Sequence, residues 1–396
     1  MFRYVFLIVQ FVVFFLVSPV YASDTDQPTF TELTVKSSLS DTEFDTSGIL
    51  FDYNYNELAV KAVQKQVTLF SERIRERFSI WLSRSGKYIE MMKNILKENN
   101  IPEEIVFLPL IESGFNPNAY SRAKAVGYWQ FIASTARRYG LEINWWRDER
   151  RDPEKSTEAA ANYLSDLYKM FGCWNLAMAA YNAGEGRILK AMNKTGTDDY
   201  WALLNTNYIK NETKDYVPKF IAASLIANSP QDFGFEDLEF YPPLEYDTVM
   251  ISSPVDLDII AKCAETSIDV IRELNPELKR WCTPPDVPEY TVRIPAGKNE
   301  LFLENLESVP EEERFSIDIY KVKKGDTFTK ISKKTGVPVK VILDLNAWEK
   351  VTLLKIGMKI YLPPKGKYKL EKDDKGAVKK ATYKYQNTKP KPKKKI

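Results

Sequence analysis

The sequence contains no histidine among its 396 residues. Histidine supplies the base in Ser-His-Asp and Cys-His catalysis, and it is a frequent metal ligand. Its absence excludes those two catalytic classes, imidazole metal sites and a histidine base acting near neutral pH. Any chemistry must use carboxylates, hydroxyls, thiols or lysines, and we expect neither a metal nor a cofactor.

A hydrophobic run long enough to span a bilayer is also missing from the N-terminus. The apolar run there extends from Val5 to Val17, about 13 residues, whereas a spanning helix needs about 20. It follows Arg3 and ends before Val20-Tyr21-Ala22, where small residues suit a signal peptidase. We therefore predict a cleavable signal peptide over residues 1–22 and a periplasmic or cell-envelope location, with an uncleaved anchor as the alternative. The absence of a cysteine just after the run argues against a lipoprotein anchor.

Cysteine is scarce, with three residues in the chain, Cys173, Cys263 and Cys282. An exported protein meets an oxidising compartment, where a disulfide can form. Cys263 and Cys282 flank two short predicted helices. We predict a disulfide between them and a reduced Cys173.

The chain lacks a large net charge of either sign, since its 56 Lys and Arg nearly balance its 54 Asp and Glu. The balance hides a segregation, because residues 364–396 hold 13 Lys and 3 acids. Such a basic, disordered tail suits an anionic wall or membrane surface, or is a solvated tail without a partner. We expect no nucleic-acid partner.

The length predicts more than one domain. Residues 23–56 are rich in Ser, Thr and Asp and favour a linker or arm. From Val63, apolar residues recur every three or four positions at Val67, Phe70, Ile74, Phe78 and Trp81, which predicts an amphipathic helix. Helical patterns continue, and we predict a helical domain over residues 57–235 with its core at 95–228.

Strand-like segments follow Pro230 in two similar stretches. Residues 318–363 predict a strand, two short helices and a closing strand, in the order βααβ. Residues 250–297 follow the same order without a Gly-Asp-Thr turn, and we interpret them as a degenerate copy.

One carboxylate stands out chemically. Glu112 ends the apolar segment Leu108–Ile111, and apolar burial raises a carboxyl pKa toward the value that a general acid needs. The alternative for an isolated Glu at a helix end is a simple salt bridge.

Two further motifs follow Glu112-Ser113 in order. They are Gly127-Tyr128-Trp129-Gln130-Phe131 and Ala180-Tyr181-Asn182-Ala183-Gly184. Together the three motifs resemble the family-1 lytic transglycosylases, and especially the membrane-bound type D enzymes, which also carry LysM modules. The resemblance implies a goose-lysozyme-like (SLT) helical catalytic domain. Trp129 and Phe131 are equally compatible with a role in the hydrophobic core.

The resemblance also implies roles. Glu112 would be the sole catalytic acid/base for cleaving the bond between N-acetylmuramic acid and N-acetylglucosamine. The resemblance implies that Ser113, Gln130, Tyr181, Asn182 and Tyr216 bind the substrate around the sugars. The partner would be the glycan strands of peptidoglycan.

A second catalytic carboxylate is not evident in the sequence, because residues 114–141 contain no Asp or Glu. A hydrolytic glycosidase needs such a group. Four later acids, Glu142, Asp148, Glu149 and Asp152, could still approach Glu112 in three dimensions. The alternatives to a lytic transglycosylase are therefore a hydrolytic muramidase and a catalytically silent wall-binding scaffold.

The βααβ unit at 318–363 resembles a LysM module. The resemblance implies that Gly325, Asp326 and Thr327, with the loop around Leu353, bind N-acetylglucosamine-containing glycans. The alternative is that Asp326 and Thr327 only cap the first helix.

Overall fold

The computed structural model describes residues 57–367. The predicted signal peptide, the linker and the basic tail beyond Lys367 lie outside the described residues. Within the described part, no helix combines the length and the apolar character that crossing a membrane would require.

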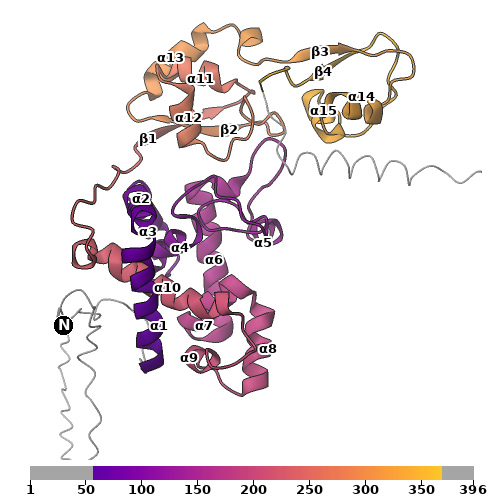
Figure 1. Ribbon diagram of the computed structural model, residues 1–396. Coiled ribbons are helices and arrows are strands. Elements are labelled where there is room, and N and C mark those ends of the chain that lie inside the picture. Colours follow the sequence, from indigo (N-terminus) through magenta and orange to yellow (C-terminus); the bar gives the residue numbers. More distant parts are fainter. Residues whose placement is uncertain (1–56, 368–396) are drawn as a thin grey trace, which may run out of the picture. The chain divides into compact units, whose positions relative to one another are not determined.

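Helices are the main regular elements between residues 57 and 233, and loops connect them (Figure 1). The α-helices are α1 (Glu57–Thr68), α2 (Arg75–Ser85), α3 (Ile89–Glu98), α4 (Leu108–Ser113), α5 (Ala133–Arg138), α6 (Pro153–Phe171), α7 (Trp174–Ala183), α8 (Glu185–Thr195), α9 (Tyr200–Leu203) and α10 (Asn211–Asn228). Shorter 3-10 turns occupy Glu103–Phe107, Glu149–Arg151 and Pro230–Phe233.

The amphipathic helix predicted after Val63 is present but interrupted. A π-helical turn, Leu69–Arg73, separates α1 from α2, and Ile74 leaves the helical conformation. Most of the predicted apolar face is still buried, with Ile74 and Trp81 partly exposed, and the rings of Phe70 and Phe78 stack at 4.4 Å across the break. The spacing therefore identified the buried face, whereas the break has no counterpart in the apolar pattern.

Helix α10 is central to the helical domain, because it packs against both α1 and α7 (Figure 1). Small residues allow this close approach: Ala222 and Ala223 on α10 and Ala179 and Ala180 on α7 are fully buried. Helix α10 thereby brings Tyr216 to α4, which carries Glu112.

The first small unit contains β1 (Tyr246–Ile251), α11 (Leu257–Cys263), α12 (Ile268–Leu274), β2 (Tyr290–Pro295) and α13 (Asn299–Ser308). Its strands are antiparallel, with Val249 opposite Val292. Strand β1 begins at Tyr246, before the predicted start of this copy at residue 250, and Val249 and Ile251 alternate with exposed residues as a half-buried strand requires. Helix α13 was not predicted.

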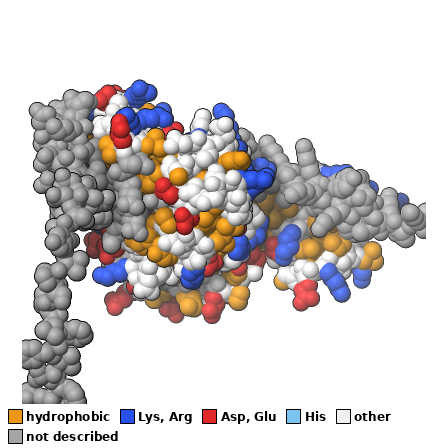
Figure 2. Space-filling model, turned by 90° about the horizontal axis from the view of Figure 1, so that it is seen from below, with side chains coloured by type: hydrophobic (Ala, Val, Ile, Leu, Met, Phe, Trp, Pro, Cys, Tyr) orange, Lys and Arg blue, Asp and Glu red, His pale blue; other side chains and the backbone are white. Residues whose placement is uncertain are grey.

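The second small unit contains β3 (Asp318–Lys321), α14 (Phe328–Thr335), α15 (Val339–Leu345) and β4 (Lys359–Leu362), with β3 antiparallel to β4. The predicted mainly helical fold with βααβ units is confirmed. Figure 2 shows one face of the molecule, on which acidic and basic side chains are interspersed with exposed hydrophobic ones.

The predicted disulfide is wrong. Cys263 and Cys282 are free thiols, as is Cys173. The reason is that they belong to different hydrophobic cores. Cys263 packs in the core of the first unit, whereas Cys282 lies with Trp281, Trp146 and residues of the second unit. Burial raises the pKa of both thiols, which keeps them protonated.

Candidate active site

Glu112 lies in the last turn of α4, a short helix whose residues Leu108, Pro109 and Leu110 are buried. The helix ends at Gly114, which adopts a left-handed conformation with φ of 59°. A Cβ atom at this position would lie 2.3 Å from the Trp81 ring, so only glycine fits. The sequence thus holds the carboxylate at the end of a buried, sharply terminated helix.

The pKa of Glu112 is raised to about 7, chiefly because burial penalises the ionised carboxylate. Tyr216 of α10 donates a hydrogen bond to Glu112 Oε1, which lowers the pKa. The charge of Glu212 raises it and that of Lys219 lowers it. A carboxyl group with a pKa near 7 can both donate and accept a proton at neutral pH, as a general acid/base must.

The second motif forms a compact loop, Lys124–Phe131, which we call the site segment. Trp129 and Phe131 are buried, and Trp129 Nε1 donates to Thr157 Oγ1 of α6 at 2.9 Å. These two aromatic residues therefore belong to the core. Gln130 is partly exposed, with φ of 50°, and its side-chain amide donates to the Gly127 carbonyl oxygen at 2.8 Å.

Two predicted site residues hold the backbone of the site segment. Ser113 Oγ donates to the Tyr128 carbonyl oxygen at 2.8 Å, and the Tyr181 hydroxyl donates to the Trp129 carbonyl oxygen at 2.7 Å. The carbonyls of adjacent residues are thus bound by α4 and by α7. Ser113 and Tyr181 fix the loop relative to Glu112.

Tyr181 and Tyr216 share an electrostatic environment with Glu112. Burial raises the pKa of both phenols well above the usual value, and the negative charge of Glu112 raises it further. Asn182, next to Tyr181, accepts a hydrogen bond from Thr213 of α10 at 3.0 Å. The structure therefore brings α4, the site segment, α7 and α10 together around one carboxylate.

Four acids could have supplied a second catalytic carboxylate, and each of them forms an ion pair. Asp148 binds Arg150 at 2.7 Å, Glu149 binds Lys155 at 2.6 Å, and Asp152 binds Arg293 at 3.0 Å. Glu142 pairs with Arg147. None of the four is among the groups whose charges shift the pKa of Glu112.

Sequence reasoning missed Glu212, which is exposed in the first turn of α10. Its charge acts on Glu112. A signal was available, because Glu212 precedes Tyr216 by four residues and so lies on the same helical face.

Removing the Tyr216 hydroxyl should raise the pKa of Glu112 further, because its hydrogen bond stabilises the carboxylate. If cleavage requires protonated Glu112, the rate falls above pH 7, and Tyr216→Phe moves this fall to higher pH. The measurement is the pH dependence of cleavage of a soluble glycan. Tyr163→Phe is the control, because the Tyr163 hydroxyl binds Glu185 and not Glu112. An unmoved pH limb in Tyr216→Phe would contradict this account.

In the second small unit, the three residues predicted to bind glycan form hydrogen bonds with nearby residues of the same unit. Asp326 Oδ2 accepts from the Tyr320 hydroxyl and from the Lys323 amide, each at 2.8 Å. Thr327 caps α14 by accepting from the Lys330 amide, and the Gly325 carbonyl accepts from Lys330 Nζ. These contacts favour the capping alternative for Thr327, whereas Asp326 binds within the turn before α14 and does not cap the helix.

Comparison with family models gives three matches. Residues 90–204 match the transglycosylase SLT domain, residues 245–311 the LysM-like domain of lytic transglycosylase MltD, and residues 320–363 the LysM domain. The chain carries an SLT domain and two LysM-type domains. Glu112 and the site segment lie inside the SLT domain, and we call the small units the first and second LysM modules.

The chain is also similar to curated lytic transglycosylases. Membrane-bound lytic murein transglycosylase D of Escherichia coli K12 is 34% identical over 306 residues, which cover 71% of this chain and 66% of the relative. The chain thus spans just under two thirds of that relative. Membrane-bound lytic murein transglycosylase C of Pectobacterium atrosepticum is 27% identical over 165 residues, covering 35% of this chain and 46% of the relative.

Among solved structures, the 70 kDa soluble lytic transglycosylase of Escherichia coli is 24% identical, with a TM-score of 0.34, and the match covers 44% of this chain and 30% of that one.

Proposed function

We propose that this chain is a peptidoglycan lytic transglycosylase with Glu112 as its catalytic acid/base. One observation carries the proposal: the Glu112 carboxyl group accepts a hydrogen bond from Tyr216 and has a pKa raised to about 7 within the residues that match the SLT domain. The names of the relatives agree with it. Ser113, Gln130, Tyr181, Asn182 and Tyr216 would hold the sugars and the site segment around Glu112.

The mechanism asks Glu112 to act twice. The protonated carboxyl group gives its proton to the oxygen between N-acetylmuramic acid and N-acetylglucosamine. The bond from this oxygen to C1 of N-acetylmuramic acid then breaks, while the 2-acetamido carbonyl of the same sugar stabilises C1. The resulting carboxylate then takes the proton of the C6 hydroxyl, whose oxygen bonds to C1. The products are a 1,6-anhydro end and a free 4-hydroxyl group, and no water is consumed.

The alternatives make different demands. A hydrolytic muramidase needs a second carboxylate. Asp148, Glu149 and Asp152 are buried in ion pairs, so such a mechanism would have to use a more exposed acid, for which Glu142 and Glu212 are candidates. A non-catalytic scaffold would leave glycans intact.

Digestion of purified sacculi by the full chain distinguishes these functions. The proposed reaction releases fragments with 1,6-anhydro ends, each one water lighter than the reducing fragments that a muramidase releases. Mass analysis of the fragments measures this difference. Reducing ends alone would favour the muramidase, and intact glycans would favour the scaffold.

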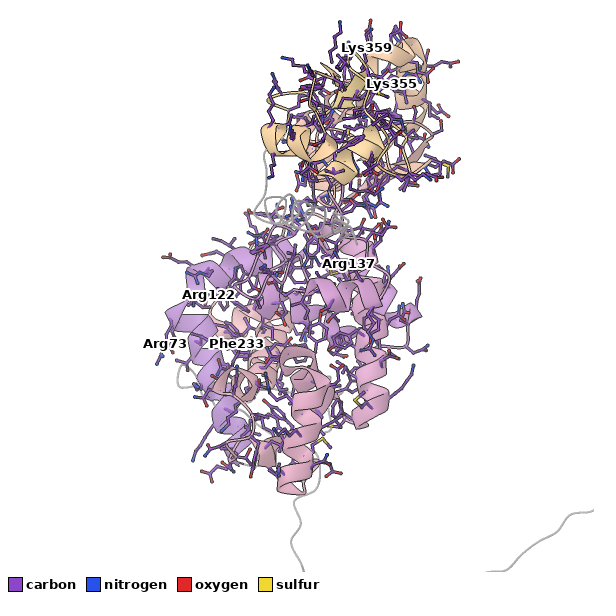
Figure 3. The ribbon with its side chains drawn as sticks, turned by 90° about the vertical axis from the view of Figure 1, so that its right-hand side faces the viewer. Arg73, Arg122, Arg137, Phe233, Lys355 and Lys359 are labelled. Atoms are coloured by element: carbon purple, nitrogen blue, oxygen red, sulfur yellow. The ribbon has the colours of Figure 1, made fainter. Side chains whose placement is uncertain are left out.

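We further propose that the second LysM module binds the glycan of the cell wall. Its loop between α15 and β4 exposes Leu353 and Ile356, at 82% and 71%. Lys355 and Lys359 are exposed on the same module (Figure 3). Because the polar groups of Gly325, Asp326 and Thr327 are engaged, this loop is the better candidate for the contact.

We also propose, from the sequence, that the signal peptide exports the chain to the cell envelope and that the basic tail binds an anionic partner.

A further inference from the structure

One buried arginine, Arg150, binds both ends of the site segment. Arg150 Nη1 donates to the carbonyl oxygens of Lys124 and Phe131, the two ends of the segment, at 3.1 Å each. Its other nitrogens bind both oxygens of Asp148, at 2.8 and 2.7 Å. Arg150 is therefore a clamp across the loop that carries Gln130.

The clamp is attached to the first LysM module. The Asp148 amide donates to the Glu277 carbonyl at 2.9 Å, and the Lys279 amide donates to the Trp146 carbonyl at 2.9 Å. Glu277 and Lys279 follow α12 of the module, so a strand-like pairing joins the module to the chain just before Arg150. These bonds are buried, since Asp148 and Glu277 are 3% and 2% exposed.

Arg293 of β2 provides a second attachment. Its Nη1 and Nη2 donate to the Asp152 carboxylate at 3.0 to 3.1 Å. Asp152 is the N-cap of α6 and accepts from the amides of Glu154 and Lys155. Helix α6 in turn carries Thr157, which binds Trp129 of the site segment. A residue of the module thus fixes the start of the helix on which the site segment rests.

We propose that the first LysM module positions the active site and that Arg150 and Arg293 are the positioning residues. The module acts on Glu112 through the backbone of the site segment, to which Ser113 and Tyr181 are bound. Its catalytic relevance rests on the proposed function, whereas the mechanical coupling does not. The first LysM module, which lacks the Gly-Asp-Thr turn, therefore has a structural role that does not depend on glycan binding.

The test uses the full chain with Arg293→Met, Arg293→Lys and the control Arg272→Met. Arg272 is exposed on α12 of the same module, so its replacement removes the same charge without touching Asp152. Hydrogen–deuterium exchange should accelerate at the amides of Val126 and Gly127, which bond within or beside the site segment. We expect acceleration in Arg293→Met, less in Arg293→Lys, none in Arg272→Met, and none in α10.

Turnover of a soluble glycan supplies the second readout. Misplaced catalytic groups commonly cost ten- to a hundred-fold in rate, so kcat per folded molecule should fall at least about tenfold in Arg293→Met, with partial recovery in Arg293→Lys. A loosened site segment also admits water to Glu112, so the alkaline pH limb should move to lower pH. A mere loss of folded protein would lower the rate equally at every pH.

Unchanged exchange at Val126 and Gly127 in Arg293→Met would overturn the proposal, and so would wild-type kcat with an unmoved pH limb. If the wild-type chain cleaves no glycan, the proposed function fails, and the exchange experiment still decides whether the module holds the site segment.

Discussion

Glu112→Gln is expected to abolish glycan cleavage while leaving the protein folded. Positioned acid/base catalysis contributes about 10²- to 10⁴-fold, and the loss should reach the upper part of this range because one group serves both proton transfers. The amide is nearly isosteric, and Tyr216 can still donate to its oxygen. The measurement is the rate of fragment release from sacculi, together with circular dichroism of the variant.

Two controls sharpen this result. Glu158→Gln changes an exposed glutamate on α6 and should retain wild-type cleavage. Glu212→Gln removes a charge that raises the pKa of Glu112, so it should shift the alkaline limb to lower pH and retain cleavage below it. Loss of cleavage at all pH values in Glu212→Gln would support the muramidase, and full activity in Glu112→Gln would refute the assigned site.

Of the substitutions that add one methyl group to the site segment, Gly127→Ala should destabilise the folded protein most. Gly127 has φ of 83°, and a Cβ atom would lie 1.8 Å from the Arg150 carbonyl oxygen. Relief requires movement of buried backbone beside the Asp148–Arg150 pair. Gly140→Ala is the matched control, because Gly140 has φ of 86° and no atom within 4 Å of the added carbon.

Both alanine variants share the cost of a left-handed conformation, about 1 kcal/mol. Gly127→Ala should lose roughly 3 kcal/mol more than Gly140→Ala, as severe core strain does. Urea denaturation of both variants measures the free energy of unfolding. Equal losses would mean that the backbone around the Arg150 carbonyl moves easily to make room for the added methyl group.

The local part of the site could be predicted from the sequence. Apolar residues before Glu112 predict its apolar setting, and the three motifs predict Gln130, Tyr181 and Asn182 through their resemblance to a family. Each motif is a short-range pattern, whereas the resemblance links the motifs to one another. The same holds for the two helices and two strands at 318–363, whose periodicities are short-range signals.

Long-range contacts could not be predicted. The bond from Arg293 to Asp152 joins residues 141 positions apart, and no local pattern distinguishes Arg293 from an exposed arginine of a strand. The predicted disulfide failed for the same reason, because helix order did not reveal that Cys263 and Cys282 enter different cores. The ion pairs of Asp148, Glu149 and Asp152 likewise depend on tertiary packing.

The central claim is that Glu112 completes the reaction with the substrate's own C6 hydroxyl and without water. Digestion of sacculi in heavy-oxygen water tests this most directly, because the origin of the oxygen at C1 separates the two reactions. The account predicts 1,6-anhydro fragments without heavy oxygen at C1. Reducing fragments labelled at C1 would contradict it.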